Sequence, residues 1–155
     1  NLFYITETSM TQGINKNSAV IIAGKKYKVN QKHRTNKPKV DCTQWIVSET
    51  DERSFFGNAI KSQYICSKNC YWWVEATAVT IKPIEIGKTD LNYAFIAKFR
   101  SDNNDEWHGY PVTGERAPHD IPPTSVLAKW RELKIFSKKE INDIERGRGY
   151  VKNCA

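Results

Sequence analysis

The segment from residue 124 to residue 147 carries the signals of two consecutive helices, and it constrains the fold more than any other part of the sequence. Four apolar side chains recur with the spacing of one helix face: Val126, Leu127, Trp130 and Leu133. A capping box and a hydrophobic staple follow, formed by Ser137 with Glu140 and by Phe136 with Ile141. Gly147 then lies where a glycine commonly ends a helix. We therefore predict a C-terminal helical hairpin over residues 124–147.

Short runs of β-branched and aromatic residues fill much of the chain before this hairpin, a pattern typical of strands. We expect strands at residues 19–23, 27–29, 43–48, 71–81 and 91–100. The last two are expected to pair through a turn at residues 87–90. One short helix is predicted after residue 50, because acidic residues occupy its first turn and Lys61 lies near its end.

These patterns together predict an α+β fold. We expect an antiparallel β-sheet, one short helix after residue 50 and the C-terminal helical hairpin packed on one face of the sheet. A chain of 155 residues has the length of one domain, so a single domain over residues 1–155 is predicted. Its parts are a basic β-hairpin and loop at 19–40, central strands at 43–100, a long loop at 101–123 and the hairpin at 124–147. Loops as long as the third part are commonly functional.

Several classes of protein are excluded by what the sequence lacks. Its uninterrupted apolar runs, such as residues 19–23, are far shorter than the roughly 18–20 residues that cross a bilayer, so no membrane partner is expected. The first residues lack the basic start and apolar run of a secretory signal, which favours a cytoplasmic location. Residues 1–9 enter no site prediction. Motifs for nucleotide binding, zinc proteases and serine hydrolases are absent, so no cofactor is predicted.

The four cysteines are expected to be free thiols: Cys42, Cys66, Cys70 and Cys154. Three residues separate Cys66 from Cys70, where zinc ligands are commonly separated by two. No second close pair of Cys or His residues follows, so no metal site is predicted.

Positive charge is concentrated near the N-terminus. The formal net charge is +7, and residues 1–50 contain eight basic and three acidic side chains. Seven cations lie in the run that ends at Lys39: Lys25, Lys26, Lys28, Lys32, Arg34, Lys37 and Lys39. Such a run is typical of a surface that binds an anionic partner such as nucleic acid, although it could also be a solvated face.

Aromatic residues make up 12% of the chain, and they supply candidate stacking platforms for bases. Trp72 and Trp73 would point to opposite faces of a strand, so one could be exposed while the other packs in the core; core packing for both is the alternative. The predicted nucleic-acid-binding residues are Lys25, Lys26, Lys28, Lys32, His33, Arg34, Lys37, Lys39, Arg116 and Trp72.

Two histidines in the long loop, His108 and His119, are candidates for acid–base chemistry. Cleavage of RNA without a metal needs a base for the 2′-hydroxyl proton, an acid for the leaving oxygen and a cation for the developing charge. Imidazole suits both proton transfers because its ordinary pKa is near neutrality. Glu106 or Asp120 could orient an imidazole, and Tyr110 could stack on a base. The predicted catalytic residues are His108, His119, Glu106 and Tyr110, and the alternative for each histidine is a packing role.

Three functions remain open from the sequence. The first is a nucleic-acid-binding domain for RNA or single strands, with metal-independent nuclease activity based on histidine as a candidate. The second is a protein-interaction module, such as an inhibitor or assembly factor, with exposed Trp, Tyr and Arg anchors. The third is an enzyme acting on a small anionic substrate in the 102–123 loop through His108, Tyr110 and Arg116.

Overall fold

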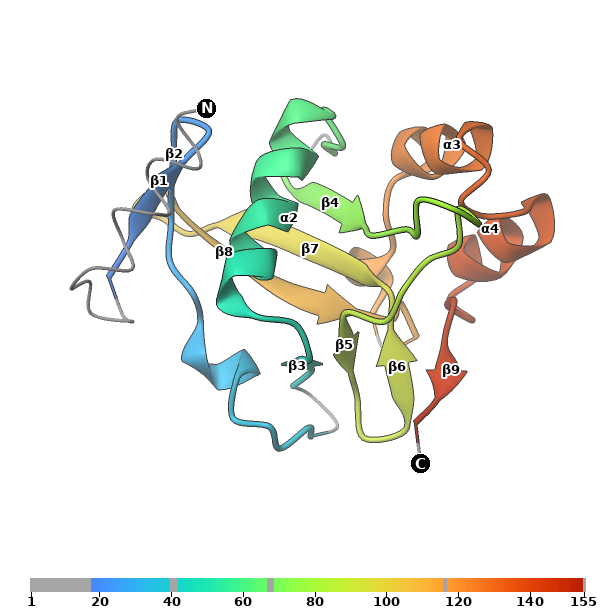
Figure 1. Cartoon of the computed structure of the whole chain (residues 1–155), viewed down its shortest axis with the longest axis horizontal. Helices are drawn as coiled ribbons and strands as arrows, with labels where there is room; N and C mark the ends of the chain where they lie inside the picture. The colour runs from blue at the N-terminus through green and yellow to red at the C-terminus, as the bar shows by residue number, and fades with distance from the viewer. Residues whose placement is uncertain (1–17, 40–41, 67–68, 116, 155) are drawn as a thin grey trace.

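Two β-sheets and three α-helices make up an α+β fold within residues 18–39, 42–66, 69–115 and 117–154, which the computed structural model describes (Figure 1). The helical elements are η1 (Gln31–His33), α2 (Glu49–Lys61), η2 (Pro118–Asp120), α3 (Thr124–Glu132) and α4 (Lys138–Glu145). The strands are β1 (Val20–Ile22), β2 (Lys25–Tyr27), β3 (Gln44–Trp45), β4 (Tyr71–Val74), β5 (Gly87–Lys88), β6 (Asn92–Ala94), β7 (Ile96–Ser101), β8 (Glu106–Val112) and β9 (Lys152–Asn153).

The larger sheet is mixed, with the strand order β1-β2-β8-β7-β4. β2 lies parallel to β8, with Tyr27 opposite Trp107, and the other neighbouring strands are antiparallel. The remaining strands form a separate antiparallel sheet, β3-β5-β6-β9. The prediction of one antiparallel sheet is therefore wrong. A parallel pair needs a long crossover, and the chain between β2 and β8 supplies it.

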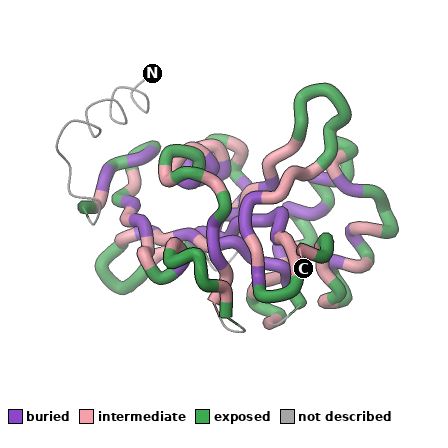
Figure 2. Tube along the Cα trace, turned by 60° about the horizontal axis from the view of Figure 1, so that its bottom comes forward, coloured by how far each residue is buried: buried purple, intermediate pink, exposed green. Residues whose placement is uncertain are grey.

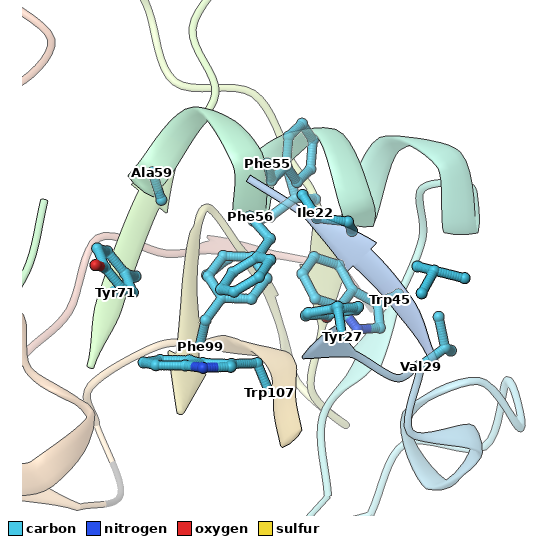
Figure 3. Packing of buried hydrophobic residues seen from close by; sticks show 13 residues of the cluster. Ile22, Tyr27, Val29, Trp45, Phe55, Phe56, Ala59, Tyr71, Phe99 and Trp107 are labelled. Carbon is cyan, nitrogen blue, oxygen red and sulfur yellow. The ribbon is translucent and has the colours of Figure 1, made fainter. Parts of the chain in front are cut away.

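Alternation along β7 and β8 divides the apolar residues between the two faces of the larger sheet. Phe99 and Trp107 lie toward α2, where the ring of Phe56 packs with centroid distances of 5.2 and 5.6 Å (Figure 3). Ile96 and Val112 belong to a second cluster, which contains residues of α3 and α4. The sheet is thus covered by α2 on one face and by the α3–α4 pair on part of the other.

The predicted helices are confirmed, and so is the predicted capping box of α4. The hydroxyl of Ser48 accepts a hydrogen bond from the backbone N–H of Asp51 at 3.0 Å and begins α2. In the capping box of α4, the Ser137 hydroxyl accepts from the Glu140 N–H at 3.2 Å, and Glu140 accepts from the Ser137 N–H at 2.8 Å. Gly147 has a φ of +79°, as expected for a glycine after a helix end.

The predicted strands are found, but they are shorter, shifted or divided; β3, for example, covers only two of the residues predicted at 43–48. β4 ends at Val74, and the backbone then turns, with the N–H of Ile81 bonded to the carbonyl of Thr77 at 3.1 Å. The strand predicted over residues 91–100 divides at Phe95 between β6 and β7, which belong to different sheets. β4 does pair with β7, but the first two residues of the turn predicted at 87–90 form β5, and the chain then turns into β6.

Residues 106–112 of the long loop predicted at 101–123 form β8, the middle strand of the larger sheet. The sequence does not predict this strand, because Gly109 and Pro111 are residue types that usually interrupt strands. A Cβ atom at Gly109 would lie 2.3 Å from the Phe99 ring, so glycine is needed there for the ring to pack against the strand. Pro111 pairs with Ala97 of β7. Within the described part of the chain, the loop that carries η2 comprises residues 113–115 and 117–123.

Buried residues gather along the central strands, and exposed residues lie in the outer turns (Figure 2). Among the described residues, no helix combines the length and apolar character that crossing a bilayer requires.

Candidate functional site

A cavity of about 800 Å³ opens on the face of the larger sheet opposite α2. Its floor is formed by the ends of β7 and β8, through Arg100, His108 and Tyr110. One wall comes from Asn30, Lys32, His33 and Thr43, and the other from Ala117, His119 and Asp120 on η2. All three histidines of the chain therefore line one cavity, together with Lys32 from the basic run.

His33 is held in one tautomer at the wall of this cavity. Its Nδ1 lies 2.8 Å from the carbonyl oxygen of Thr43, which only accepts hydrogen bonds, so Nδ1 carries the proton and the neutral ring keeps a lone pair on Nε2. Only 7% of the residue is exposed, and burial lowers the pKa of His33 below its ordinary value. The imidazole stacks on the Tyr110 ring, with centroids 5.2 Å apart and an interplanar angle of 13°. His33 is therefore a neutral imidazole at pH 7.

His108 has both ring nitrogens engaged. Nδ1 lies 3.0 Å from the carbonyl oxygen of Lys28, and Nε2 lies 3.2 Å from Asp102 Oδ2 and 3.6 Å from Glu106 Oε1. Backbone N–H groups of Asn104 and Glu106 bond to the Asp102 carboxylate and lower its pKa. His108 consequently joins the segment after β2 to β8 and to the turn before it.

The carboxylates beside His108 could also serve as metal ligands. One ligand atom from each of Asp102, Glu106 and His108 lies within 4.8 Å of the other two, so these residues could hold a divalent cation. Direct hydrogen bonds of His108 with the Lys28 carbonyl and the Asp102 carboxylate account for the same geometry without a metal.

Asp120 connects the η2 wall to the floor. Its Oδ1 accepts a hydrogen bond from the Tyr110 hydroxyl at 3.0 Å and lies 3.4 Å from the Lys98 ammonium and 3.7 Å from His119 Nε2. Lys98 is only 5% exposed and also donates to the carbonyl of His119. Burial and the Asp120 charge raise the pKa of Tyr110, so its phenol stays protonated. Lys98 thereby anchors η2 to the sheet.

Sequence reasoning missed several residues of this site, among them Lys98, Arg100, Thr43 and Asp102. The alternation of residues 96–101 contained a usable signal for two of them, since positions 98 and 100 fall on the face opposite Phe99. Thr43 contributes through its carbonyl oxygen, and its side chain gives no such signal.

The predicted cations are dispersed. Lys32 is exposed and lines the cavity, and Lys37 and Lys39 line a neighbouring hollow that shares Lys32. Lys25 lies over the Trp107 ring at 5.3 Å, on the α2 side of the sheet, and Lys26 is exposed beside it. Lys28 reaches the site through its carbonyl oxygen, and Arg116 lies outside the described residues.

Two predicted binding residues are not exposed to a ligand. Trp72 is 2% exposed in the cluster with α3 and α4, so it offers no platform for a base. Arg34 donates to Glu52 Oε1 at 2.7 and 3.0 Å and to the Val47 carbonyl at 2.9 Å, so its guanidinium is used inside the fold. Both side chains are therefore used in the interior of the fold, whereas the sequence prediction placed them on a binding surface.

No family model, no curated protein and no solved structure matches this chain.

Proposed function

We propose that this protein binds single-stranded nucleic acid, in particular RNA, in the histidine cavity and cleaves it by metal-independent acid–base chemistry. The observation that carries the proposal is the convergence of three imidazoles with Lys32 and Arg100 in one cavity of about 800 Å³. Imidazoles can supply both proton transfers of phosphodiester cleavage, and the two cations can stabilise the negative charge that develops on the phosphate oxygens.

The cavity favours an unstacked nucleotide over a duplex. Its volume falls within the roughly 300–1,000 Å³ of small-ligand sites. The stacked rings of His33 and Tyr110 supply an aromatic surface at its wall and floor, and single strands are commonly held by such surfaces. Lys32 and Arg100 are exposed, so each can approach a phosphate.

The role of the cations is tested with Lys32→Gln and Arg100→Gln, measured by fluorescence anisotropy with a short, labelled, mixed-sequence RNA. Each variant is expected to weaken binding by about 5- to 20-fold at low salt, because a charged contact to phosphate contributes roughly 1–2 kcal/mol. Lys138→Gln is the matched control, since Lys138 is an exposed cation at the start of α4 and does not line the cavity. Equal affinity of all three variants would remove the cavity from the binding site.

Nuclease activity is tested by incubating the same RNA with the full chain in EDTA. The proposal expects discrete cleavage products under these conditions. Retention of the RNA without cleavage would leave a binding protein that is not a nuclease. If the chain does not retain RNA even at low salt, the proposal is overturned.

A second candidate, an enzyme acting on a small anionic substrate, is favoured by the same cavity volume and cations.

The protein-interaction alternative has less support. All five tryptophans lie in the described part of the chain; Trp45, Trp72, Trp107 and Trp130 are buried and Trp73 is half-buried. The Trp anchors that this alternative requires are thus not on the surface.

A further inference from the structure

We infer that His33 and His119 divide the two proton transfers, His33 as the base and His119 as the acid, and that the substrate class is RNA with a 2′-hydroxyl at the cleaved link. This inference rests on the proposed function. It starts from the three different hydrogen-bonding environments of imidazoles that line one cavity.

His33 has the properties of a base. The carbonyl of Thr43 fixes the proton on Nδ1, and Nε2 has no hydrogen-bond partner among the described residues. Two neighbours restrict the ring: Tyr110 by stacking and Cys42 by its sulfur 3.8 Å from Nδ1. Burial and the nearby Lys32 both disfavour the charged imidazolium, so Nε2 is available to accept a proton from a ligand in the cavity.

His108 is excluded from proton transfer by its contacts. Both nitrogens already face protein acceptors, the Lys28 carbonyl on one side and the Asp102 and Glu106 carboxylates on the other. A ligand would have to break one of these contacts before it could exchange a proton with the ring. We therefore assign His108 as a positioning residue that holds the strand segment leading to His33 against β8.

His119 has the properties of an exchangeable acid. Its side chain is 63% exposed, so it can take up a proton from water after each reaction cycle. Its Nε2 lies 3.7 Å from Asp120 Oδ1, beyond hydrogen-bonding distance, and thus remains open to a ligand. The backbone is nevertheless fixed, because buried Lys98 donates to the His119 carbonyl. An exposed imidazole on an anchored turn is suited to protonate a departing oxygen.

The reaction balances with these two groups. Nε2 of His33 accepts the proton of the 2′-hydroxyl, and the 2′-oxygen attacks the adjacent phosphorus. The bond from phosphorus to the 5′-oxygen breaks, and the protonated His119 gives its proton to that oxygen. The products are a 2′,3′-cyclic phosphate and a 5′-hydroxyl, while Lys32 and Arg100 stabilise the additional negative charge during the displacement. No co-reactant is needed, but the 2′-hydroxyl is required.

The test uses the full chain with three substrates that differ only at the cleaved link: ordinary RNA, RNA with one 2′-deoxy sugar, and RNA with sulfur in place of the bridging 5′-oxygen. A thiolate leaves without an acid, so the sulfur substrate bypasses the acid but still needs the base. His119→Ala is expected to lose about 10²- to 10⁴-fold in cleavage rate on ordinary RNA and to recover most of that loss on the sulfur substrate. His33→Ala is expected to lose a similar factor on both, and the deoxy substrate is expected to resist cleavage.

Because His33 is buried, a second variant controls for folding. His33→Asn places an amide near the position of Nδ1, so it retains a donor for the Thr43 carbonyl while lacking Nε2. It is expected to fold, as judged by thermal unfolding, and to remain inactive on both cleavable substrates. Lys138→Gln should match the unaltered chain throughout.

The outcomes separate the inference from the proposed function. Recovery of the His33 variants on the sulfur substrate, failure of His119→Ala to recover, or ready cleavage of the deoxy substrate would each overturn the assignment while the nuclease function stands. If the unaltered chain does not bind RNA, or binds it without cleaving it, the proposed nuclease function itself fails.

Discussion

Glu52 is fully buried in α2, and its carboxylate is held by two side chains from the segment before the helix. Arg34 donates two hydrogen bonds to Oε1, and the Tyr27 hydroxyl donates to Oε2. Burial raises the pKa of Glu52, while the charge of Arg34 acts in the opposite direction. This ion pair explains why Arg34, which lies within the basic run, does not serve as a surface cation.

Removal of Arg34 is expected to destabilise the fold. Arg34→Met should lower the free energy of unfolding by about 3–5 kcal/mol, because it leaves a buried carboxylate without its cation. It should also raise the pKa of Glu52 further. A carboxyl whose pKa is raised in the folded state binds protons more tightly there, so the stability of the variant should fall as pH rises from acid toward neutral. Urea unfolding at several pH values measures both effects.

Lys37→Met is the matched control for this experiment, since Lys37 is an exposed cation of the same run. It should change the stability by less than about 0.5 kcal/mol. A loss below about 1 kcal/mol in Arg34→Met, with no dependence on pH, would contradict the account of the ion pair.

Helices and strands that depend on neighbouring residues could be predicted from the sequence, whereas those that depend on distant residues could not. The capping box at Ser137 and the glycine at 147 are set by neighbours a few residues away, so the sequence predicted the last helix with both of its ends. β8 was missed because Gly109 is required by the ring of Phe99, ten residues distant, and not by local backbone preference. The parallel pairing of β2 with β8 joins segments about eighty residues apart, and no local pattern encodes it.

The candidate site could likewise be predicted only in part from the sequence. The histidine loop and the basic run were identified from residue types, and the cavity unites parts of both. The separate environments of His33, His108 and His119 depend on partners such as the carbonyls of Lys28 and Thr43, which have no signature in the sequence. Residue types therefore marked the candidate residues, and only the tertiary contacts distinguish their environments.

Lys98 anchors η2, and its replacement tests this positioning role. Lys98→Met should lower kcat for RNA cleavage by about 10- to 100-fold, because misplacement of His119 by even an ångström slows proton transfer. The Kd for RNA should change by less than about twofold, because buried Lys98 does not contribute to the exposed charge. Single-turnover kinetics measure the effect on cleavage, and anisotropy measures the effect on affinity. Both are recorded at a temperature where the variant is folded. Equal losses in kcat and affinity would contradict a positioning role.

The seven cations of the basic run lie in different parts of the fold, so long-range attraction and direct contact involve different residues. Of the seven cations between Lys25 and Lys39, Lys32 lines the cavity, Lys25 lies on the α2 side of the sheet and Arg34 is paired inside the fold. The whole run can raise the rate of encounter with an anion, while the contacts within the cavity are few.

Salt dependence measures the number of direct contacts. For single strands the affinity falls with a log–log slope of about 0.7 per contacted phosphate. Contact through Lys32 and Arg100 predicts a slope of about 1.5, whereas contact through all seven cations of the basic run would give about 5. Anisotropy titrations over a range of salt concentrations decide between these values. A slope near the higher value would contradict a binding site confined to the cavity.

The most direct test of the central claim is single-turnover cleavage of a labelled single-stranded RNA in EDTA by the full chain and by the double variant His33→Asn/His119→Asn. Thermal unfolding verifies that both proteins are folded. The account predicts products that end in a 2′,3′-cyclic phosphate, formed by the unaltered chain and slowed by at least about 10²-fold in the double variant. Cleavage at equal rates by both proteins, or no cleavage by either, would contradict it.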